Sequence, residues 1–307
     1  MKKNITVLLV ISVVLMIAGI ASAIEPVKCV LAPQGSGLTW DGNYLWLASN
    51  NDNRIYKLDP DNGDILDDIP SPEFSPRDLA FDGQYLWNVD PDVVFGGIFQ
   101  IDPATGIVIR SIPMPPSAVS PSGLTWDGEA LWLSAVAAGI LPMIYKIDPS
   151  DGSVIGSFTA PAGEFGFSGL AWDGDYLWFS SSTFSPTGFF KIDPSSGEVL
   201  DFIEYVYTGE GLTFDNLYLW NNSIVESKTC QFGISPLLIG DVDNDGNINI
   251  LDALYTARFS AGLSVPPDFD ETAADTNCDT FANILDALLI ARYAAGLSMD
   301  GTEWCGG

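Results

Sequence analysis

The stretch Gly37-Leu-Thr-Trp-Asp-Gly42 decides the fold, because the same phrase returns four more times along the chain. The other copies are Asp78-Leu-Ala-Phe-Asp-Gly83, Gly123-Leu-Thr-Trp-Asp-Gly128, Gly169-Leu-Ala-Trp-Asp-Gly174 and Gly211-Leu-Thr-Phe-Asp-Asn216. The shared aspartate falls at positions 41, 82, 127, 173 and 215, so successive copies are 41 to 46 residues apart. Strand-type repeats of this length are typical of β-propeller blades. We therefore predict a mainly β fold with a five-bladed β-propeller before residue 236.

Each repeat has the pattern of four short strands joined by tight turns. The Asp-Gly pair after the first strand is a strong signal for a two-residue hairpin. The second strand, Tyr44-Leu-Trp-Leu47 in the first repeat, carries a tryptophan in every copy. The third strand, Ile55-Tyr-Lys-Leu58, leads into an Asp-Pro-x-x-Gly turn, where proline fixes φ and glycine adopts a positive φ. A fourth strand then completes the blade.

The last repeat is incomplete, and the start of the chain offers the missing piece. The fifth repeat lacks the Asp-Pro-x-x-Gly turn and a fourth strand, whereas the strand-like Val27-Lys-Cys-Val-Leu31 precedes the first repeat. In a closed ring this segment would complete the last blade, beside a third strand near residues 229–232. An even number of cysteines suggests disulfides, and four cysteines allow three pairings. Ring closure selects Cys29 with Cys230 and leaves Cys278 with Cys305.

Composition excludes several classes of function. The 307 residues include 12 Lys and Arg, 40 Asp and Glu and no His, which gives a formal net charge of −28. Without histidine there is no Ser-His-Asp or Cys-His relay and no His-ligated metal. The acidic excess argues against binding to nucleic acid or to anionic membrane surfaces. It suits hard cations such as Ca²⁺, which prefer carboxylate oxygens.

The first residues have the pattern of an export signal. Lys2 and Lys3 precede an apolar run over about residues 5–20, and Ala21-Ser22-Ala23 is a small-x-small cleavage pattern. We expect residues 1–23 to be a secretory signal peptide; the alternative is an uncleaved membrane anchor. The mature protein is then secreted and has no membrane segment.

The repeated residues are expected to be structural. Eight of the nine tryptophans occupy repeat positions, which favours packing between blades; the alternative is a sugar-binding surface. Aspartates at turn positions are expected to hold turns rather than to catalyse. These are Asp41, Asp59, Asp127, Asp148 and Asp193. Function is expected on the opposite face, where connections differ between blades. The polar candidates for ligand contact there are Arg77, Asp90, Glu164 and Glu210.

Residues 27 to about 235 resemble five-bladed propellers built from Gly-Leu-x-Trp-Asp-Gly and Lys-Ile-Asp-Pro-x-x-Gly repeats. Glutaminyl cyclases of the plant and bacterial type are also five-bladed propellers, and Tyr207-Thr-Gly-Glu-Gly-Leu-Thr213 is similar to their repeat phrase. No constellation of their catalytic residues maps onto this chain. The fold alone does not set the activity. Two hypotheses therefore remain for the propeller: a non-enzymatic binding module, or an enzyme acting on extracellular polysaccharide or peptide.

The C-terminal part contains two loops with the ligand spacing of an EF-hand calcium loop. The first loop offers oxygen ligands at Asp241, Asp243, Asp245, Asn247, Asn249 and Asp252. The second offers them at Asp275, Asn277, Asp279, Phe281, Asn283 and Asp286. Asn247 and Phe281 would use backbone carbonyls. Thr280 replaces the glycine at position 6 of the second loop, so we expect that site to be weaker or reshaped. The alternative reading of both acidic runs is a solvated surface.

Each loop is followed by a predicted helix, over residues 253–261 and 287–295, and the two units share Asn-Ile-Leu-Asp-Ala-Leu. This arrangement resembles the type I dockerin module of cellulosome-like assemblies. The resemblance implies a small all-α domain, two Ca²⁺ ions and a cohesin domain of a scaffold protein as partner. It also implies partner-binding residues, namely Ile250, Leu251, Arg258, Phe259, Ile284, Leu285, Arg292 and Tyr293. We therefore expect a signal peptide at 1–23, a propeller at 24–236 and a dockerin-like module at 237–307.

Overall fold

The repeats form the blades of a propeller. In the computed structural model, the described residues are 24–91, 96–137, 142–161, 169–181, 187–205, 209–223, 226–234, 239–243, 246–266, 269–279 and 281–305. These residues form five antiparallel four-stranded sheets. The predicted signal peptide lies outside the described residues. No helix in the described ranges is long and apolar enough to cross a membrane.

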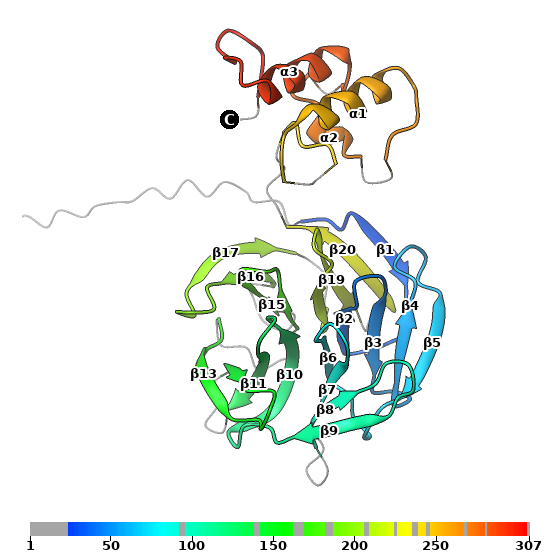
Figure 1. The fold of residues 1–307 in the computed structure, drawn as a ribbon, viewed down its shortest axis with the longest axis vertical. Coiled ribbons are helices and arrows are strands. Elements are labelled where there is room, and N and C mark those ends of the chain that lie inside the picture. The colour runs from blue at the N-terminus through cyan, green and yellow to red at the C-terminus, as the bar shows by residue number, and fades with distance from the viewer. Residues whose placement is uncertain are drawn as a thin grey trace, which may run out of the picture.

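Four blades follow the chain order from the innermost to the outermost strand (Figure 1). Blade 1 contains β2 (Gly37–Trp40), β3 (Leu45–Ser49), β4 (Arg54–Leu58) and β5 (Ile65–Pro70). Blade 2 contains β6 (Asp78–Phe81), β7 (Leu86–Asp90), β8 (Gly97–Ile101) and β9 (Val108–Ile112). Blade 3 contains β10 (Ala118–Trp126), β11 (Leu131–Ala137), β12 (Pro142–Ile147) and β13 (Val154–Thr159). Blade 4 contains β14 (Leu170–Trp172), β15 (Leu177–Ser181), β16 (Gly188–Ile192) and β17 (Val199–Glu204).

The fifth blade is assembled from both ends of the propeller sequence, as predicted. It contains β18 (Leu212–Phe214), β19 (Tyr218–Ser223) and β20 (Lys228–Gly233), and β1 (Lys28–Leu31) adds its outer strand. In the register of β1 with β20, Cys29 lies opposite Cys230. The two cysteines form a disulfide that joins residues 201 positions apart. The covalent bond therefore closes the ring at its seam.

One hydrogen-bond arrangement explains the repeated Asp and Trp. In blade 1, Oδ1 of Asp41 accepts the backbone N–H groups of Asn43 and Tyr44, which shapes the hairpin turn. Oδ2 accepts the indole Nε1–H of Trp46 at 2.8 Å. The same Asp–Trp bond occurs in all five blades, at 2.6 to 2.8 Å. The structural role predicted for Asp41 and Asp127 is thus confirmed. The other predicted turn aspartates each accept the N–H of the residue two positions later, namely Asp59, Asp148 and Asp193.

The second-strand tryptophans form the packing between blades. Their side chains are at most 3% exposed, and each lies in an apolar cluster shared by two neighbouring blades. These residues are Trp46, Trp87, Trp132, Trp178 and Trp220. Burial of a large aromatic side chain stabilises a core by several kcal/mol, on the order of 3–5 when truncation to alanine is measured. The predicted role in packing is confirmed for these five residues.

The C-terminal part folds around two helices of equal length, α1 (Ile250–Ser260) and α3 (Ile284–Ala294). Each begins three residues before the predicted start, because Asn249 and Asn283 act as N-caps. A short helix that the sequence did not predict, α2 (Glu271–Ala274), precedes the second loop. The helices enclose a small core of Val242, Ala253, Ala273, Ala274 and Ile290.

Candidate functional site

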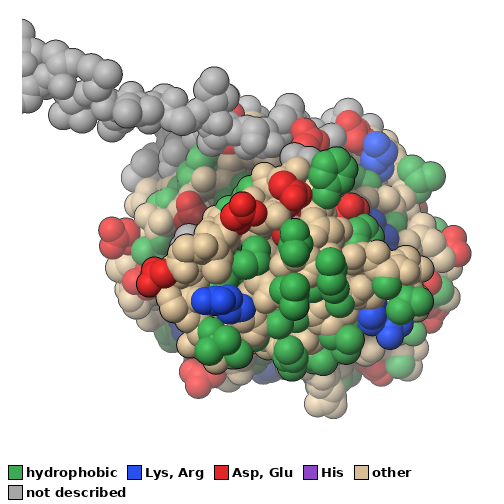
Figure 2. Space-filling model, turned by 90° about the horizontal axis from the view of Figure 1, so that it is seen from above, with side chains coloured by type: hydrophobic (Ala, Val, Ile, Leu, Met, Phe, Trp, Pro, Cys, Tyr) green, Lys and Arg blue, Asp and Glu red, His purple; other side chains and the backbone are tan. Residues whose placement is uncertain are grey.

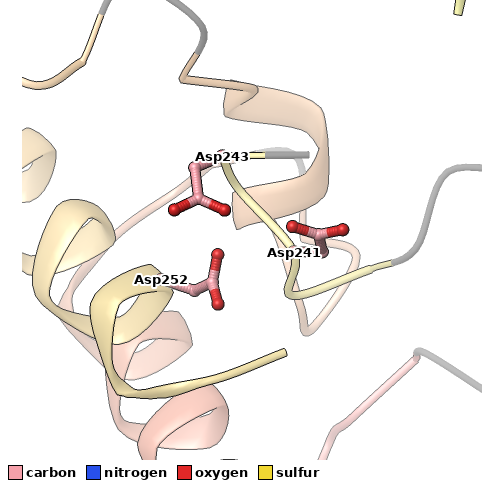
Figure 3. A group of neighbouring side chains, drawn as sticks. All are labelled: Asp241, Asp243 and Asp252. Atoms are coloured by element: carbon pink, nitrogen blue, oxygen red, sulfur yellow. The ribbon is translucent and has the colours of Figure 1, made fainter. Parts of the chain in front are cut away.

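The first acidic loop brings three carboxylates together (Figure 3). Asp241, Asp243 and Asp252 each offer an oxygen within 4.8 Å of the others. Gly246 has φ +82°, and its N–H donates to Oδ2 of Asp241 at 2.8 Å. The sharp turn expected at position 6 is therefore made by a residue without a Cβ. Asp245 lies outside the described residues.

Asp252 connects this loop to the helix that follows it. Its Oδ1 accepts the N–H of Val242 at 2.8 Å, and its Oδ2 accepts the N–H of Asn249 at 2.7 Å. The side chain of Asn249 in turn accepts the backbone N–H of Asp252, which completes a capping box at the start of α1. It also accepts the N–H of Leu251 at 2.8 Å. The residue at position 12 is thus held by backbone N–H groups of the loop itself. Three convergent carboxylates with further oxygen donors in the same loop fit a hard cation such as Ca²⁺.

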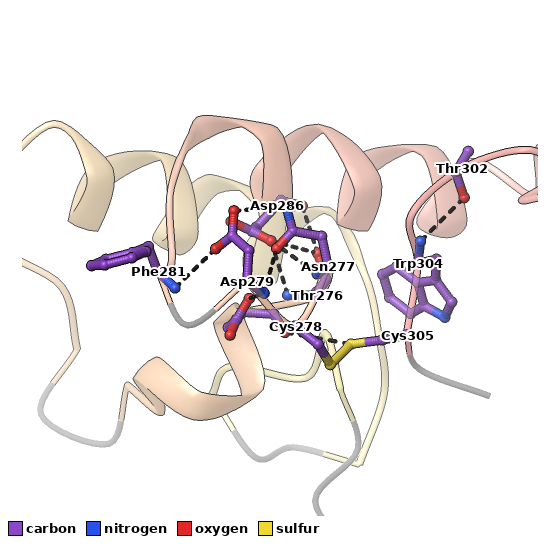
Figure 4. Close-up of a disulfide and its surroundings, with 10 residues drawn as sticks. Thr276, Asn277, Cys278, Asp279, Phe281, Asp286, Thr302, Trp304 and Cys305 are labelled. Atoms are coloured by element: carbon purple, nitrogen blue, oxygen red, sulfur yellow. Dashed lines mark hydrogen bonds between the residues drawn. A yellow bond between two sulfur atoms is a disulfide. The ribbon is translucent and has the colours of Figure 1, made fainter.

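The second loop has the same frame but a different arrangement of its acids (Figure 4). Asp286 accepts the N–H groups of Thr276 and Asn277 on Oδ1 and that of Asn283 on Oδ2. The side chain of Asp279 accepts from Nδ2 of Asn277 at 3.2 Å. Among the described residues, a cluster of three acids within 4.8 Å occurs in the first loop only. Thr280, on which the prediction of a weaker site rests, lies outside the described residues.

A disulfide braces the second loop. Cys278, at loop position 4 with φ +56°, is bonded to Cys305, 27 residues later (Figure 4). The N–H of Cys305 also donates to the carbonyl of Thr276 at 2.8 Å. Both predicted cysteine pairs are therefore present.

The comparison with protein families agrees with this geometry. The model described as "Dockerin type I domain" matches residues 239–294. Residues 239–294 are a type I dockerin domain. Dockerin domains bind calcium and have cohesin domains as partners, and proteins that carry them are typically extracellular. The two disulfides are consistent with an oxidising compartment.

Comparison with solved structures supports the propeller fold. The glutaminyl cyclase of Myxococcus xanthus is 12% identical, with a TM-score of 0.55 over 69% of this chain and 97% of that chain. Virginiamycin B lyase of Staphylococcus aureus is 19% identical, with a TM-score of 0.42 over 68% and 66% of the two chains. The first likeness shows the fold and does not extend to activity. The curated protein sequences give no significant match to this chain.

The dockerin domain exposes apolar side chains in two equivalent sets. Ile250, Leu251 and Leu254 of α1 are 64%, 46% and 50% exposed. Their counterparts in α3 are also exposed, namely Ile284, Leu285 and Leu288. Figure 2, which looks onto the helical end of the molecule, shows apolar side chains gathered across the middle of that face. Leu254 and Leu288 are not among the predicted partner-binding residues, although both belong to the shared Asn-Ile-Leu-Asp-Ala-Leu phrase.

The other predicted partner-binding residues already make contacts within the domain. The guanidinium Nε of Arg258 donates to the carbonyl of Ser264 at 2.8 Å, and that of Arg292 donates to the carbonyl of Ser298 at 2.6 Å. These bonds fix the loop after each helix. The ring of Phe259 stacks on Phe269 with the ring centroids 4.9 Å apart. In the second half, Tyr293 stacks on Trp304 with centroids 5.1 Å apart.

Three of the four predicted propeller candidates form one electrostatic group, here called the mouth cluster. Arg77 directly precedes β6, Glu210 lies just before β18, and Asp90 ends β7. Burial raises the pKa of Glu210 to about 7, and the neighbouring Arg77 opposes this shift. Burial lowers the pKa of Arg77, against the charges of Glu210 and Asp90. Glu164, the fourth candidate, lies outside the described residues.

Another acidic residue, Asp78, lies where the innermost strands meet. It is fully buried, and its Oδ1 accepts the N–H groups of Leu38 and Leu79, both at 2.9 Å. Its Oδ2 accepts the N–H of Leu124 at 2.7 Å, and Leu170 also donates to this carboxylate. One side chain thus binds the innermost strands of four blades. Burial raises the pKa of Asp78 well above its usual value, and these four N–H groups oppose the shift.

Asp78 departs from the repeat pattern of the sequence. The other four repeats have glycine at this position, namely Gly37, Gly123, Gly169 and Gly211. These glycines allow the strands to approach closely: a Cβ at Gly37 would lie 2.4 Å from the Cα of Asp78. At this position of the repeat, blade 2 is therefore the one blade with a side chain other than that of glycine.

Proposed function

We propose that this protein is secreted and is held on a cohesin-bearing scaffold by its calcium-loaded dockerin domain, while the propeller serves as a binding module. The observation that carries the proposal is the acidic triad of Asp241, Asp243 and Asp252 at the base of a helix pair with an exposed apolar face. In this proposal residues 1–23 are the export signal, 24–236 the propeller and 237–307 the dockerin module.

The apolar face supports a docking role for both halves of the module. Exposed leucine and isoleucine side chains gathered on one face are unusual for a surface that meets only water. Burial of each such side chain at an interface contributes about 1.5–3 kcal/mol of favourable transfer free energy, before the cost of association. Because α1 and α3 carry equivalent sets, either half has the residues to dock. Calcium would act by fixing the loops from which both helices start.

Binding to recombinant type I cohesins, measured by biolayer interferometry in Ca²⁺ and then in excess EDTA, tests this proposal. We expect binding in Ca²⁺ that EDTA abolishes. Leu254→Asp and Leu288→Asp each place a charge on one half and should leave binding through the other half. The double variant should bind cohesin at least about 100-fold more weakly. Whichever half of the module docks, an aspartate charge would then be buried at the interface.

The matched control is Leu66→Asp, because Leu66 lies on β5 of the propeller and is similarly exposed, at 48%. This variant should bind as the unchanged protein does. If the double variant binds normally, or if EDTA has no effect, the proposed docking mode is wrong.

A second candidate function is an enzyme that uses the mouth cluster. The favouring observation is a half-buried carboxyl group, Glu210, whose pKa of about 7 suits proton transfer near neutral pH, beside the cation Arg77. The test is turnover of peptides with N-terminal glutamine and of soluble polysaccharides by the unchanged protein and by Glu210→Gln. Turnover that is lost in Glu210→Gln supports the enzyme; absence of turnover on both substrate classes rejects this candidate.

A further inference from the structure

Five aromatic side chains line a cavity at the tight-turn end of the propeller channel. They are the last residues of the innermost strands, one from each blade, and are here called the aromatic ring: Trp40, Phe81, Trp126, Trp172 and Phe214. The cavity has a volume of about 360 Å³ and is also lined by Thr39, Thr125 and Thr213. It lies at the opposite end of the innermost strands from the mouth cluster, since Arg77 precedes β6 and Phe81 ends it.

The aromatic ring differs from the tryptophans that pack the blades. The packing tryptophans are at most 3% exposed, and their indole N–H groups are bonded to the turn aspartates. Each member of the aromatic ring packs on one side against a cluster between blades, yet all five remain partly exposed. The Nε1 atom of Trp40 is buried and has no hydrogen-bond partner in the described structure. Packing alone therefore does not account for these five residues.

The charge around this cavity is negative and uneven. Asp41 and Asp82 belong to its lining. In blade 1 the carboxylate of Asp41 has a cation beside it, since Nζ of Lys57 lies 3.8 Å from Oδ2; blades 3 and 4 have equivalent lysines. In blade 2 the equivalent residue is Gln100, whose Nε2 donates to Asp82 at 3.0 Å. Among the described residues no Lys or Arg lies within salt-bridge distance of Asp82. The cation of this blade is Arg110, whose Nε donates to Gln100 at 2.9 Å and whose guanidinium lies over the ring of Trp87. Asp82 therefore has a cation one residue away but no direct ion pair of the kind found in blades 1, 3 and 4.

We propose that this cavity binds an organic ammonium cation, such as a quaternary ammonium group. Aromatic faces attract cations, by about 0.5–2 kcal/mol for each favourable ring, and a ring from every blade surrounds the same space. Asp82, which lacks a direct ion pair among the described residues, and the net charge of −28 add attraction for a cation and repel anions. A neutral ligand of the same shape would gain the apolar contact but neither the cation–π attraction nor the attraction to negative charge. The inference gives a ligand class to the binding role proposed above for the propeller and does not depend on the dockerin domain.

Titration of the full chain with choline and with its neutral isostere 3,3-dimethylbutan-1-ol, followed by tryptophan fluorescence and calorimetry, tests the proposal. We expect choline to bind at least about tenfold more tightly than the alcohol, because the two ligands differ in charge and hardly in shape. Equal affinity for both would show an apolar pocket only. Absence of choline binding, or binding of a methyl glycoside instead, would also overturn the proposal.

Two variants locate the site without relying on a single substitution. Trp126→Leu removes one ring and should weaken choline binding about tenfold; its thermal unfolding shows whether the propeller stays folded. Gln100→Lys leaves the aromatic ring intact and gives Asp82 the lysine found in blades 1, 3 and 4, so it should weaken choline binding several-fold. The control is Gln231→Lys in blade 5, where Gln231 contacts Asp215, an aspartate that does not line the cavity.

The control variant should bind choline as the unchanged protein does. If Gln100→Lys binds choline normally, the assignment of charge to Asp82 is wrong. Calcium binding measured in the same samples separates the two proposals. If the chain binds calcium but does not bind choline, the proposed cation site is refuted and the dockerin proposal is unaffected.

Discussion

Asp78→Asn is the substitution that most directly tests how the propeller is held together. Asparagine has the shape of aspartate but replaces one carboxylate oxygen with an NH₂ group, which donates and does not accept. In the structure both oxygens accept backbone N–H groups, from Leu38 and Leu79 on Oδ1 and from Leu124 on Oδ2. Whichever way the amide is turned, donors then face donors at the centre of the ring.

The expected loss follows from the number of N–H groups left without an acceptor. A buried N–H without an acceptor costs about 1–3 kcal/mol, so one or two such groups give about 1–6 kcal/mol. The variant also removes a buried charge, which offsets part of this loss, as the raised pKa of Asp78 indicates. We expect a net loss of about 2–4 kcal/mol in the free energy of unfolding of the propeller, a large share of an ordinary domain's stability.

Urea unfolding followed by tryptophan fluorescence measures this loss, because eight of the nine tryptophans lie in the propeller repeats. The matched control is Asp175→Asn, at an exposed turn position of blade 4, which should change the stability by less than about 0.5 kcal/mol. A loss below about 1 kcal/mol in Asp78→Asn would refute the reasoning that this carboxylate joins the four blades.

Two further predictions follow from the ring and its mouth. The double variant Cys29→Ala, Cys230→Ala should lose about 5 kcal/mol in urea unfolding, because the chain-entropy model assigns this value to a loop of 201 residues; a loss below about 1 kcal/mol would contradict the role of the bond at the seam. Burial raises the pKa of Glu210, so the folded protein holds this proton more tightly than the unfolded chain. The melting temperature of the unchanged protein should therefore fall, relative to Glu210→Gln, as the pH rises from about 5 to about 8; equal pH profiles would contradict the shift.

The sequence was sufficient to predict the features that repeat. Asp-Gly and Asp-Pro-x-x-Gly turns have strong local preferences. Five copies of the first-strand phrase, four of them ending in Asp-Gly, and four copies of the Asp-Pro-x-x-Gly turn define strand order, blade number and the seam at which Cys29 meets Cys230. The calcium loops were recognisable for the same reason, since their ligand spacing is local.

Features that depend on how distant segments meet were not predictable in this way. The role of Asp78 requires four strands from different blades to converge on one residue, and only its departure from the glycine pattern marks it in the sequence. Arg258 bonds to the loop that follows its own helix, and Leu254 is exposed. Both features follow from the direction in which α1 presents its side chains. The cavity lined by the five residues of the aromatic ring forms only when all five blades of the propeller have come together.

Calorimetric titration of the full chain with Ca²⁺, repeated on Asp241→Ala and Asp275→Ala, tests the central claim most directly. We predict binding that is lost from the first loop in Asp241→Ala, because this substitution removes one of the three convergent carboxylates and the acceptor of the Gly246 N–H. A second binding event that disappears in Asp275→Ala would establish the second site. Absence of binding at millimolar Ca²⁺ in the unchanged protein would contradict calcium-dependent docking.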